Sequence, residues 1–365
     1  MGFSCGIVGL PNVGKSTLFN AMTKAGAESS NYPFCTIEPN VGIVDVPDAR
    51  LTKISGLSKS KKTTPTTVEF VDIAGLVEGA SKGEGLGNQF LSNIRNVDAI
   101  VQVVRLFEDE NIIHIGEVDP LRDLDIINTE LMLKDLDTLE STIDKRLRLA
   151  NSGDKAAKAE AELLSRIREE VSKGVLIKNI DLDDNAKKTI RGYQFLTAKP
   201  LLVCANVSEG MLSSYGDNPN YKKLKAYCDE IGADIVVLCA KIEEELSELS
   251  VEEAHEYLRE LGEEKSGLEK LIMEGYSLLG LITFFTTGEK ESRAWTVRRG
   301  TKAPQAAGAI HSDMERGFIR AETVSYGDFI AAGSWNTAKE AGKLRLEGKE
   351  YIVKDGDIML FRFSV

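Results

Sequence analysis

A short glycine-containing segment near the start of the chain has the residue types needed to bind phosphate. Gly9 and Gly14 flank four residues, and Lys15 and Ser16 follow directly. Such glycines let backbone N–H groups face phosphate oxygens, while the lysine supplies positive charge and the serine hydroxyl can ligate Mg²⁺. An apolar run precedes the segment and an amphipathic run follows it, which is the context that this motif requires. We predict a phosphate-binding loop over residues 9–17, in which Lys15 meets the phosphates and Ser16 is placed to ligate Mg²⁺.

A second motif, Asp72 to Gly75, ends another strand-like run. In proteins with a phosphate loop, an aspartate here contacts the hydration shell of Mg²⁺, and the glycine N–H senses the terminal phosphate. Thr36 lies between the two motifs and is a candidate second hydroxyl ligand of the metal, the alternative being an ordinary loop threonine. We therefore expect Mg²⁺ as a cofactor, with Ser16 and Thr36 as its ligands.

The segment Asn206 to Glu209 follows an apolar run, at the place where common GTPases carry Asn-Lys-x-Asp. In those enzymes the aspartate accepts two hydrogen bonds from guanine. Here Glu209 is one methylene longer, and Val207 replaces the lysine that packs on the base. Adenine needs an acceptor for its amino group and a donor for N1, which Asn206 and the nearby backbone could provide. The pattern favours ATP over GTP, and a GTPase is the alternative.

Hydrolysis of a nucleotide needs a group that orients the attacking water. Leu76 stands where Ras-like enzymes carry a glutamine for this purpose. His114 follows a strand-like run in a polar loop and is a candidate for the role; alternatively it is a loop histidine that interacts with Glu108 or Asp109. We predict slow intrinsic ATP hydrolysis, with Lys15 acting on the phosphates and His114 as the candidate water-orienting residue.

Six short β-rich runs position these motifs. Several are continuously apolar, as expected for strands buried on both faces of a mostly parallel sheet, and helical patterns separate them. Strands that alternate with helices predict a doubly wound α/β domain, in which ligands bind at the carboxyl ends of the strands. The runs are 3–8, 41–46, 67–72, 99–105, 201–205 and 235–239.

About 95 residues separate the fourth and fifth runs, far more than a crossover connection needs. Apolar residues at helical spacing on both sides of the polar turn 151–154 predict two long helices in an antiparallel hairpin. Near the end of the chain, alternating apolar and polar residues between turn signals predict a small β-rich module. We expect a nucleotide-binding domain over 1–281, interrupted by a helical insertion at about 126–195, and a second domain over 282–365.

Together, the phosphate loop with Asn12, the Asn-x-x-Glu segment, the helical insertion and the β-rich module resemble the Obg-like ATPase (YchF-type) family along essentially the whole chain. The resemblance implies an Obg-type P-loop G domain with an inserted helical hairpin and a C-terminal TGS domain of β-grasp shape. It implies an ATP-hydrolysing switch of a GTPase lineage that associates with the ribosome or its large subunit. In the family pattern, residues 12–17 cradle the phosphates, Ser16 and Thr36 hold Mg²⁺, and Val207 contributes a backbone contact to adenine.

Composition limits the classes of partner. The 365 residues include 45 basic and 57 acidic side chains, a net charge of −12, which excludes a general nucleic-acid coat or a polybasic membrane adaptor. Basic residues in 293–302, with Arg316 and Arg320, could still give the β-rich module a cationic face for RNA phosphate. The five cysteines form no CxxC pair, and no apolar run is long enough to span a membrane. We expect a cytoplasmic monomer that contacts the ribosome and no membrane.

Two other functions stay open at this point. Nucleotide binding could merely gate a partner interface, with incidental hydrolysis. A metabolic P-loop kinase is the weaker possibility, because Thr36 and Asp72 imply sensing of the terminal phosphate, whereas no acceptor-binding lid motif is evident.

Overall fold

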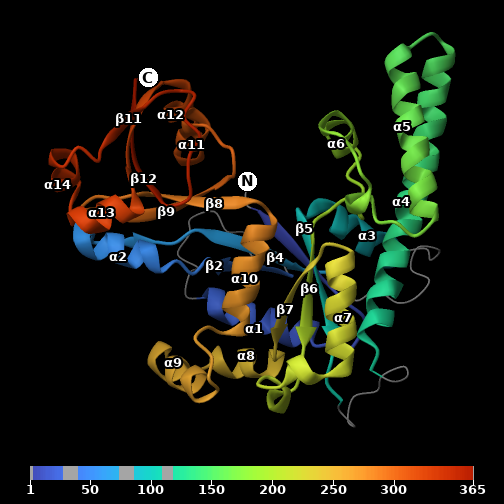
Figure 1. Ribbon diagram of the computed structural model, residues 1–365, viewed down its shortest axis with the longest axis horizontal. Coiled ribbons are helices and arrows are strands. Elements are labelled where there is room, and N and C mark those ends of the chain that lie inside the picture. Colours follow the sequence, from blue (N-terminus) through green and yellow to red (C-terminus); the bar gives the residue numbers. More distant parts are fainter. Residues whose placement is uncertain (1–2, 28–39, 74–85, 109–117, 365) are drawn as a thin grey trace. The chain divides into compact units, whose positions relative to one another are not determined.

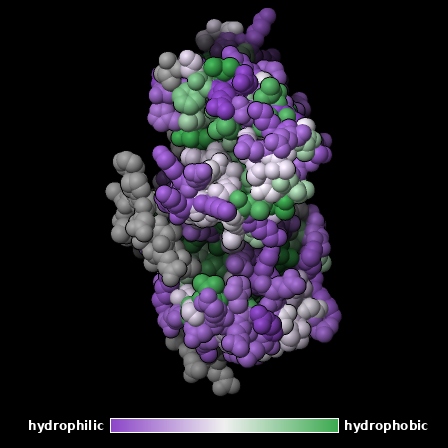
Figure 2. All heavy atoms as spheres, turned by 90° about the vertical axis from the view of Figure 1, so that its left-hand side faces the viewer, coloured by the Kyte–Doolittle hydropathy of each residue, from purple (hydrophilic) through white to green (hydrophobic). Residues whose placement is uncertain are grey.

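The computed structural model describes residues 3–27, 40–73, 86–108 and 118–364. Contacts divide the chain into two compact units, Met1–Val44 with Glu69–Gly275 and Asp45–Val68 with Tyr276–Val365. Figure 1 shows the helices and strands of both units. None of the described helices is long and apolar enough to cross a membrane. Hydrophilic side chains cover most of the face drawn in Figure 2, with apolar side chains in small groups between them.

The first sheet consists of β1 (Ser4–Val8), β2 (Val41–Asp45), β4 (Thr67–Asp72), β5 (Ala99–Arg105), β6 (Leu201–Asn206) and β7 (Asp234–Leu238). Its strand order is β2-β4-β1-β5-β6-β7, and the strands from β4 to β7 in this order are parallel. Strands β5 and β6 are buried along their whole length, which explains their continuous apolar sequences. Because parallel strands end at the same edge, the carboxyl ends of β1, β4, β5, β6 and β7 lie along one edge of the sheet.

Two helices of the first unit begin with ordinary capping signals. Asn218 accepts hydrogen bonds from two backbone N–H groups at the start of α7, and Ser250 forms a capping box with Glu253. Helix α1 packs beside α8, while α3 and α7 bury apolar side chains in the same cluster as β5 and β6. The helices are α1 (Lys15–Ala27), α3 (Leu86–Asn96), α7 (Pro219–Glu230), α8 (Ala240–Leu246), α9 (Val251–Glu260) and α10 (Gly267–Leu278).

The helical insertion consists of α4 (Pro120–Asn151), α5 (Lys155–Ser172) and the short α6 (Asp184–Arg191). Helix α4 begins at Pro120, capped by Asp119, and thus earlier than the expected start at about 126. Its first turns pack on the sheet, and its later turns pack against α5 to form the predicted hairpin (Figure 1). The two helices meet at the predicted polar turn, where Asp154 caps α5.

The second unit is a six-stranded sheet in the order β11-β10-β12-β8-β9-β3. Its strands are β3 (Thr63–Thr64), β8 (Leu281–Thr286), β9 (Ser292–Arg298), β10 (Phe318–Ser325), β11 (Arg345–Glu347) and β12 (Asp357–Phe363). Its helices are α2 (Ala49–Ser58), α11 (Ala303–Ile310), α12 (Ser312–Arg316), α13 (Tyr326–Ala332) and α14 (Trp335–Glu340). Apolar clusters lie on both faces: successive residues of β12 point to opposite sides of the sheet, and Ile358 and Met359 belong to different clusters.

Residues 45–68 belong to this second unit, although the sequence analysis assigned them to the domain over 1–281. Leu51 and Ile54 on α2 share a buried cluster with Phe285 and other C-terminal residues. Arg50 donates a hydrogen bond from Nη1 to Asp355 Oδ2 over 2.6 Å. Strand β3 extends the sheet by pairing in parallel with β9. The compact units therefore do not coincide with a single boundary between residues 281 and 282.

Candidate functional site

The phosphate loop connects β1 to α1, and its backbone conformation requires a glycine at position 14. Gly14 has a φ of 98° and Asn12 a φ of 64°, both in the left-handed region that L residues with large side chains avoid. A Cβ atom at Gly14 would also clash with Nδ2 of Asn206. Any other residue at this position would therefore push the loop away from the segment after β6.

Lys15 and Asp72 form the charged end of the site. Lys15 is 8% exposed, and its Nζ donates hydrogen bonds to the carbonyl oxygens of Gly9 (2.8 Å) and Leu10 (2.9 Å). Burial lowers the pKa of Lys15, and the nearby Asp72 carboxylate opposes this shift. Burial raises the pKa of Asp72, opposed in turn by Lys15. Oδ1 of Asp72 is buried and has no hydrogen-bond partner among the residues that the structure describes.

A cavity of about 620 Å³ joins the phosphate loop to the segment after β6. Its volume lies within the range of about 300–1,000 Å³ that is typical of ligand sites. Five of the six predicted cradle residues line it, while Val13 is buried beneath. The lining residues are Asn12, Gly14, Lys15, Ser16, Thr17, Phe107, Glu108, Asn206, Val207, Ser208, Glu209, Cys239, Ala240, Lys241 and Glu244.

Asn206 has a different environment from the one expected of a residue that only reads the base. It is 3% exposed, Nδ2 donates to the carbonyl oxygen of Val13 (2.9 Å), and Oδ1 accepts from the backbone N–H of Ala240 (3.0 Å). The side chain therefore connects the phosphate loop to the start of α8. One amide N–H and one lone pair of Oδ1 are left over for a ligand.

The neighbouring positions also have defined environments. Val207 is buried and donates its backbone N–H to the carbonyl oxygen of Leu238 (2.9 Å), so its own carbonyl oxygen is the backbone group left for a base. Glu209 is exposed at the rim of the cavity.

Sequence reasoning missed the cavity residues that follow β5 and β7. Phe107 and Glu108 are the second and third residues after β5, and 239–241 come directly after β7. Their signal was their position, because segments after parallel strands gather at one edge of the sheet. Thr36, Gly75 and His114, together with Leu76, lie outside the described residues.

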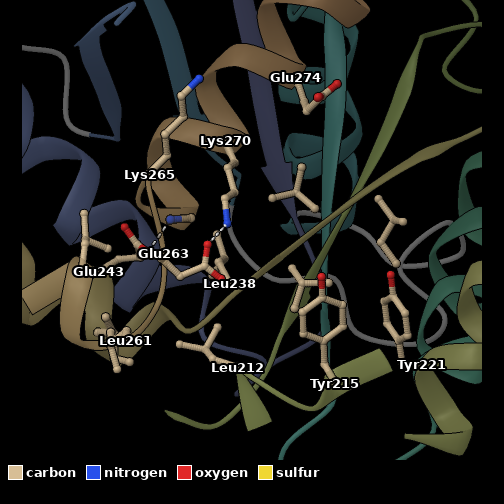
Figure 3. A pocket seen from close by; sticks show the side chains of 16 residues that line it. Leu212, Tyr215, Tyr221, Leu238, Glu243, Leu261, Glu263, Lys265, Lys270 and Glu274 are labelled. Carbon is tan, nitrogen blue, oxygen red and sulfur yellow. Dashed lines mark hydrogen bonds and ion pairs between the residues drawn. The ribbon is translucent and has the colours of Figure 1, made fainter. Parts of the chain in front are cut away.

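A second cavity, of about 330 Å³, lies beside β7 and contains no residue of the phosphate loop (Figure 3). Several polar groups in its wall already have protein partners. Lys270 donates to Glu263 over 2.5 Å, and Glu243 accepts the backbone N–H of Gly267 over 2.8 Å. The candidate nucleotide site is therefore the cavity that contains the phosphate loop.

Comparison with known proteins agrees with this geometry. Residues 4–141 match the family MMR_HSR1, described as "50S ribosome-binding GTPase", and residues 281–364 match YchF-GTPase_C, described as "Protein of unknown function (DUF933)". The "Ribosome-binding ATPase YchF" of Bacillus subtilis is 56% identical, and that of Escherichia coli O157:H7 is 54% identical, each over 100% of both chains.

A solved structure supports the same relationship. The Schizosaccharomyces pombe YchF GTPase has a TM-score of 0.90 to this chain and 41% sequence identity, with 99% of this chain and 98% of that chain covered. The likeness confirms the predicted fold class, a P-loop G domain with an inserted helical hairpin and a C-terminal β-rich module. The resemblance drawn from the motifs is confirmed as well: the chain belongs to the YchF family of P-loop proteins.

Proposed function

We propose that this protein is an ATP-binding and ATP-hydrolysing switch that associates with the ribosome or its large subunit. The observation that carries the proposal is the cavity in which the phosphate loop meets the Asn-x-x-Glu segment. Lys15 and Ser16 line one part of it and Val207 and Glu209 line another, as a nucleoside triphosphate requires.

At the phosphate end, the residues 12–17 bind the triphosphate through backbone N–H groups and the start of α1. Lys15 then exchanges the carbonyl oxygens of Gly9 and Leu10 for phosphate oxygens, which satisfy a buried ammonium group better because they carry negative charge. Lys15 thereby acts both in binding and on the charge that develops during phosphoryl transfer.

The residues at this end also fit Mg²⁺. Ser16 lines the cavity, and the buried Asp72 Oδ1, which has no hydrogen-bond partner in the described part of the chain, is an oxygen suited to a hydrated cation. Ser16 and Thr36 would hold the metal, and Asp72 would contact its hydration shell. When bound, Mg²⁺ would supply charge neutralisation on the phosphates.

At the base end, the residues favour adenine. The exposed Glu209 and the buried Val207 do not reproduce the aspartate and lysine that common GTPases use for guanine. The remaining polar capacity of Asn206 and the carbonyl oxygen of Val207 match the amino group of adenine, and Phe107 offers a ring for stacking on a base. Because one relative is named a GTPase, GTP is the alternative nucleotide.

For hydrolysis, we propose that His114 orients the attacking water, since Leu76 cannot hydrogen-bond to it. We expect slow turnover without a partner, comparable to Ras without its activator at about 10⁻⁴ to 10⁻³ per second. Gly75 would sense the terminal phosphate through its backbone N–H. A nucleotide-gated binding protein with incidental hydrolysis is the alternative if ribosomes leave turnover unchanged.

The domain assignment is part of the proposal. We assign 1–281 to an Obg-type G domain with the hairpin inserted at about 126–195, and 282–365 to a TGS domain. The start of the C-terminal family match at residue 281 supports this assignment. Asp45–Val68 would then be a segment of the first domain that packs with the second. We expect a cytoplasmic monomer.

Ribosome association rests on the names of the relatives and on basic surface residues. In the second unit, Lys302 pairs with Glu350 and Arg316 with Asp313. Such exposed pairs contribute only about 0–1 kcal/mol each, so ribosomal RNA phosphate can replace the carboxylates. The basic residues Lys145 and Arg148 on the hairpin are the competing contact.

The proposal is tested by measuring phosphate release from ATP with and without ribosomes, and co-sedimentation with ribosomal subunits. We expect ribosomes to raise turnover and Arg316→Glu with Arg320→Glu to reduce co-sedimentation. Lys145→Glu with Arg148→Glu is the matched pair on the hairpin. If only this second pair reduces co-sedimentation, the ribosome contact is assigned to the hairpin instead. A wild-type protein that does not co-sediment with ribosomal subunits would contradict the proposed ribosome association.

A further inference from the structure

Arg105, the last residue of β5, is a buried cation. Its side chain is 3% exposed, and it forms no ion pair with a carboxylate in the described part of the chain. Burying a charge without a counter-charge costs several kcal/mol, so a residue of this kind calls for a reason. The register of the sheet places it beside Asn206, the residue that connects the phosphate loop to α8.

The contacts of Arg105 concentrate on one residue. Its Nε donates a hydrogen bond to the carbonyl oxygen of Phe107 over 2.7 Å, and its guanidinium carbon lies 4.6 Å from the centroid of the Phe107 ring. Its Nη1 is buried and has no partner within the described residues. Within the described residues, the hydrogen bond from Nε and the ring contact therefore both go to Phe107. Arg105 thus contacts both the backbone and the ring of Phe107.

Phe107 lines the cavity at the phosphate loop together with Val207 and Ser208, whereas Arg105 does not line it. Phe107 also lies after the end of β5, in a segment without regular structure. A ring in such a segment loses rotamer freedom when a base stacks on it, and a preorganised ring loses less. A guanidinium stacked on one side of the ring restricts its rotation and is attracted to its π-electrons.

We infer that Arg105 is a positioning residue that holds the Phe107 ring in place for stacking on the nucleotide base. The inference rests on the proposed function, because it assigns Phe107 to the base end of that same site. Arg105 acts through Phe107 and touches neither the phosphates nor the metal.

The test compares two ligands that share their phosphates but not the base. Dissociation constants for ATP and for inorganic tripolyphosphate, both with Mg²⁺, are measured by calorimetry for the wild type and for Arg105→Met. We expect the dissociation constant for ATP to rise by about tenfold, since stacking on a base is lost in part, and that for tripolyphosphate to stay unchanged. Arg105→Lys keeps the charge but not the planar group, so the dissociation constant for ATP is expected to rise by about threefold.

A double-mutant cycle tests whether Arg105 acts through the ring. Phe107→Leu should weaken ATP binding by about tenfold, and adding Arg105→Met to it should cause little further loss. Gln102→Leu is the matched control, because Gln102 is a fully buried polar residue of the same strand whose side chain bonds to Leu124 instead. This control should leave the ratio of the two dissociation constants unchanged.

Several results would overturn the inference. One is that Arg105→Met binds ATP as tightly as the wild type. Another is that it loses as much affinity for tripolyphosphate as for ATP. A third is that the losses of ATP affinity of the two single variants add up in the double variant. If Arg105→Met does not fold, Arg105→Lys alone carries the comparison of the two ligands. A wild-type protein that binds tripolyphosphate but not ATP would instead contradict the proposed function itself.

Discussion

The phosphate loop and the segment Asp45–Val68 are close in the sequence but differ in how much of their support is local. The loop has its own contacts, since Lys15 bonds to Gly9 and Leu10 and Gly14 supplies the left-handed turn, and the distant Asn206 adds a bond to Val13. The segment Asp45–Val68 is held by residues more than 200 positions away, through Arg50 and the buried side chains of α2. A local motif can therefore identify the chemistry of a site, but it does not tell which compact unit a neighbouring segment of the chain belongs to.

The largest effect is expected where the distant contacts of Asp45–Val68 are removed. Ile54 is fully buried among C-terminal residues, so Ile54→Ala should lower the free energy of unfolding of the second unit by about 2–5 kcal/mol. Leu57 lies on the same helix but is 39% exposed, so Leu57→Ala is the matched control with a much smaller effect. The midpoint of urea unfolding, followed by tryptophan fluorescence, reports this unit because Trp295 and Trp335 both belong to it.

Equal midpoints for the Ile54→Ala and Leu57→Ala variants would contradict the packing of α2 in the second unit. The same contacts make a truncation before residue 282 a poor test of ribosome binding. Such a truncation would also expose Leu51 and Ile54, which are buried among the removed residues.

The next effect concerns the phosphate loop itself. Lys15→Ala removes the buried cation that we propose to meet the phosphates, and ATP affinity should fall by about 100-fold or more, because a charge-assisted contact is lost in a partly desolvated site. Lys24 is on the same helix but exposed and paired with Glu248, so Lys24→Ala is the control and should bind ATP normally. Similar affinities of the two variants in equilibrium titrations would show that Lys15 does not meet the nucleotide.

A smaller effect is expected on catalysis alone. If His114 orients water, His114→Ala should lower ATP turnover by about 10–100-fold and leave ATP affinity near the wild-type value, because the group acts chiefly in the transition state. Single-turnover phosphate release and equilibrium binding separate the two quantities. His255→Ala, a change at an exposed histidine of α9, should alter neither. If the His114→Ala variant hydrolyses ATP at the wild-type rate, His114 is an ordinary loop histidine that does not orient water.

The sequence predicted the parts of this molecule that depend on neighbouring residues. The phosphate loop, the buried strands and the hairpin with its turn at 151–154 all follow from local spacing, and the structure contains them. The base end was predicted only in part. Asn206, Val207 and Glu209 were found because they form a motif, whereas Phe107 and Lys241 line the same cavity only because strand ends meet in space.

The same limit explains the other differences. Nothing in 45–68 indicates that Leu51 packs with Ile358, since burial by a distant segment leaves no local pattern. The second role of Asn206, which connects the loop to α8, depends on the approach of Val13 and Ala240. The roles of Thr36, Gly75 and His114 stay predictions.

The central claim is that the cavity binds ATP in preference to GTP, and equilibrium titration of the wild-type protein with both triphosphates in the presence of Mg²⁺ tests it most directly. Because Glu209 and Val207 do not reproduce the pair that holds guanine, ATP should bind at least about tenfold more tightly, a difference of ~1.4 kcal/mol. Equal dissociation constants, or tighter binding of GTP, would contradict the claim.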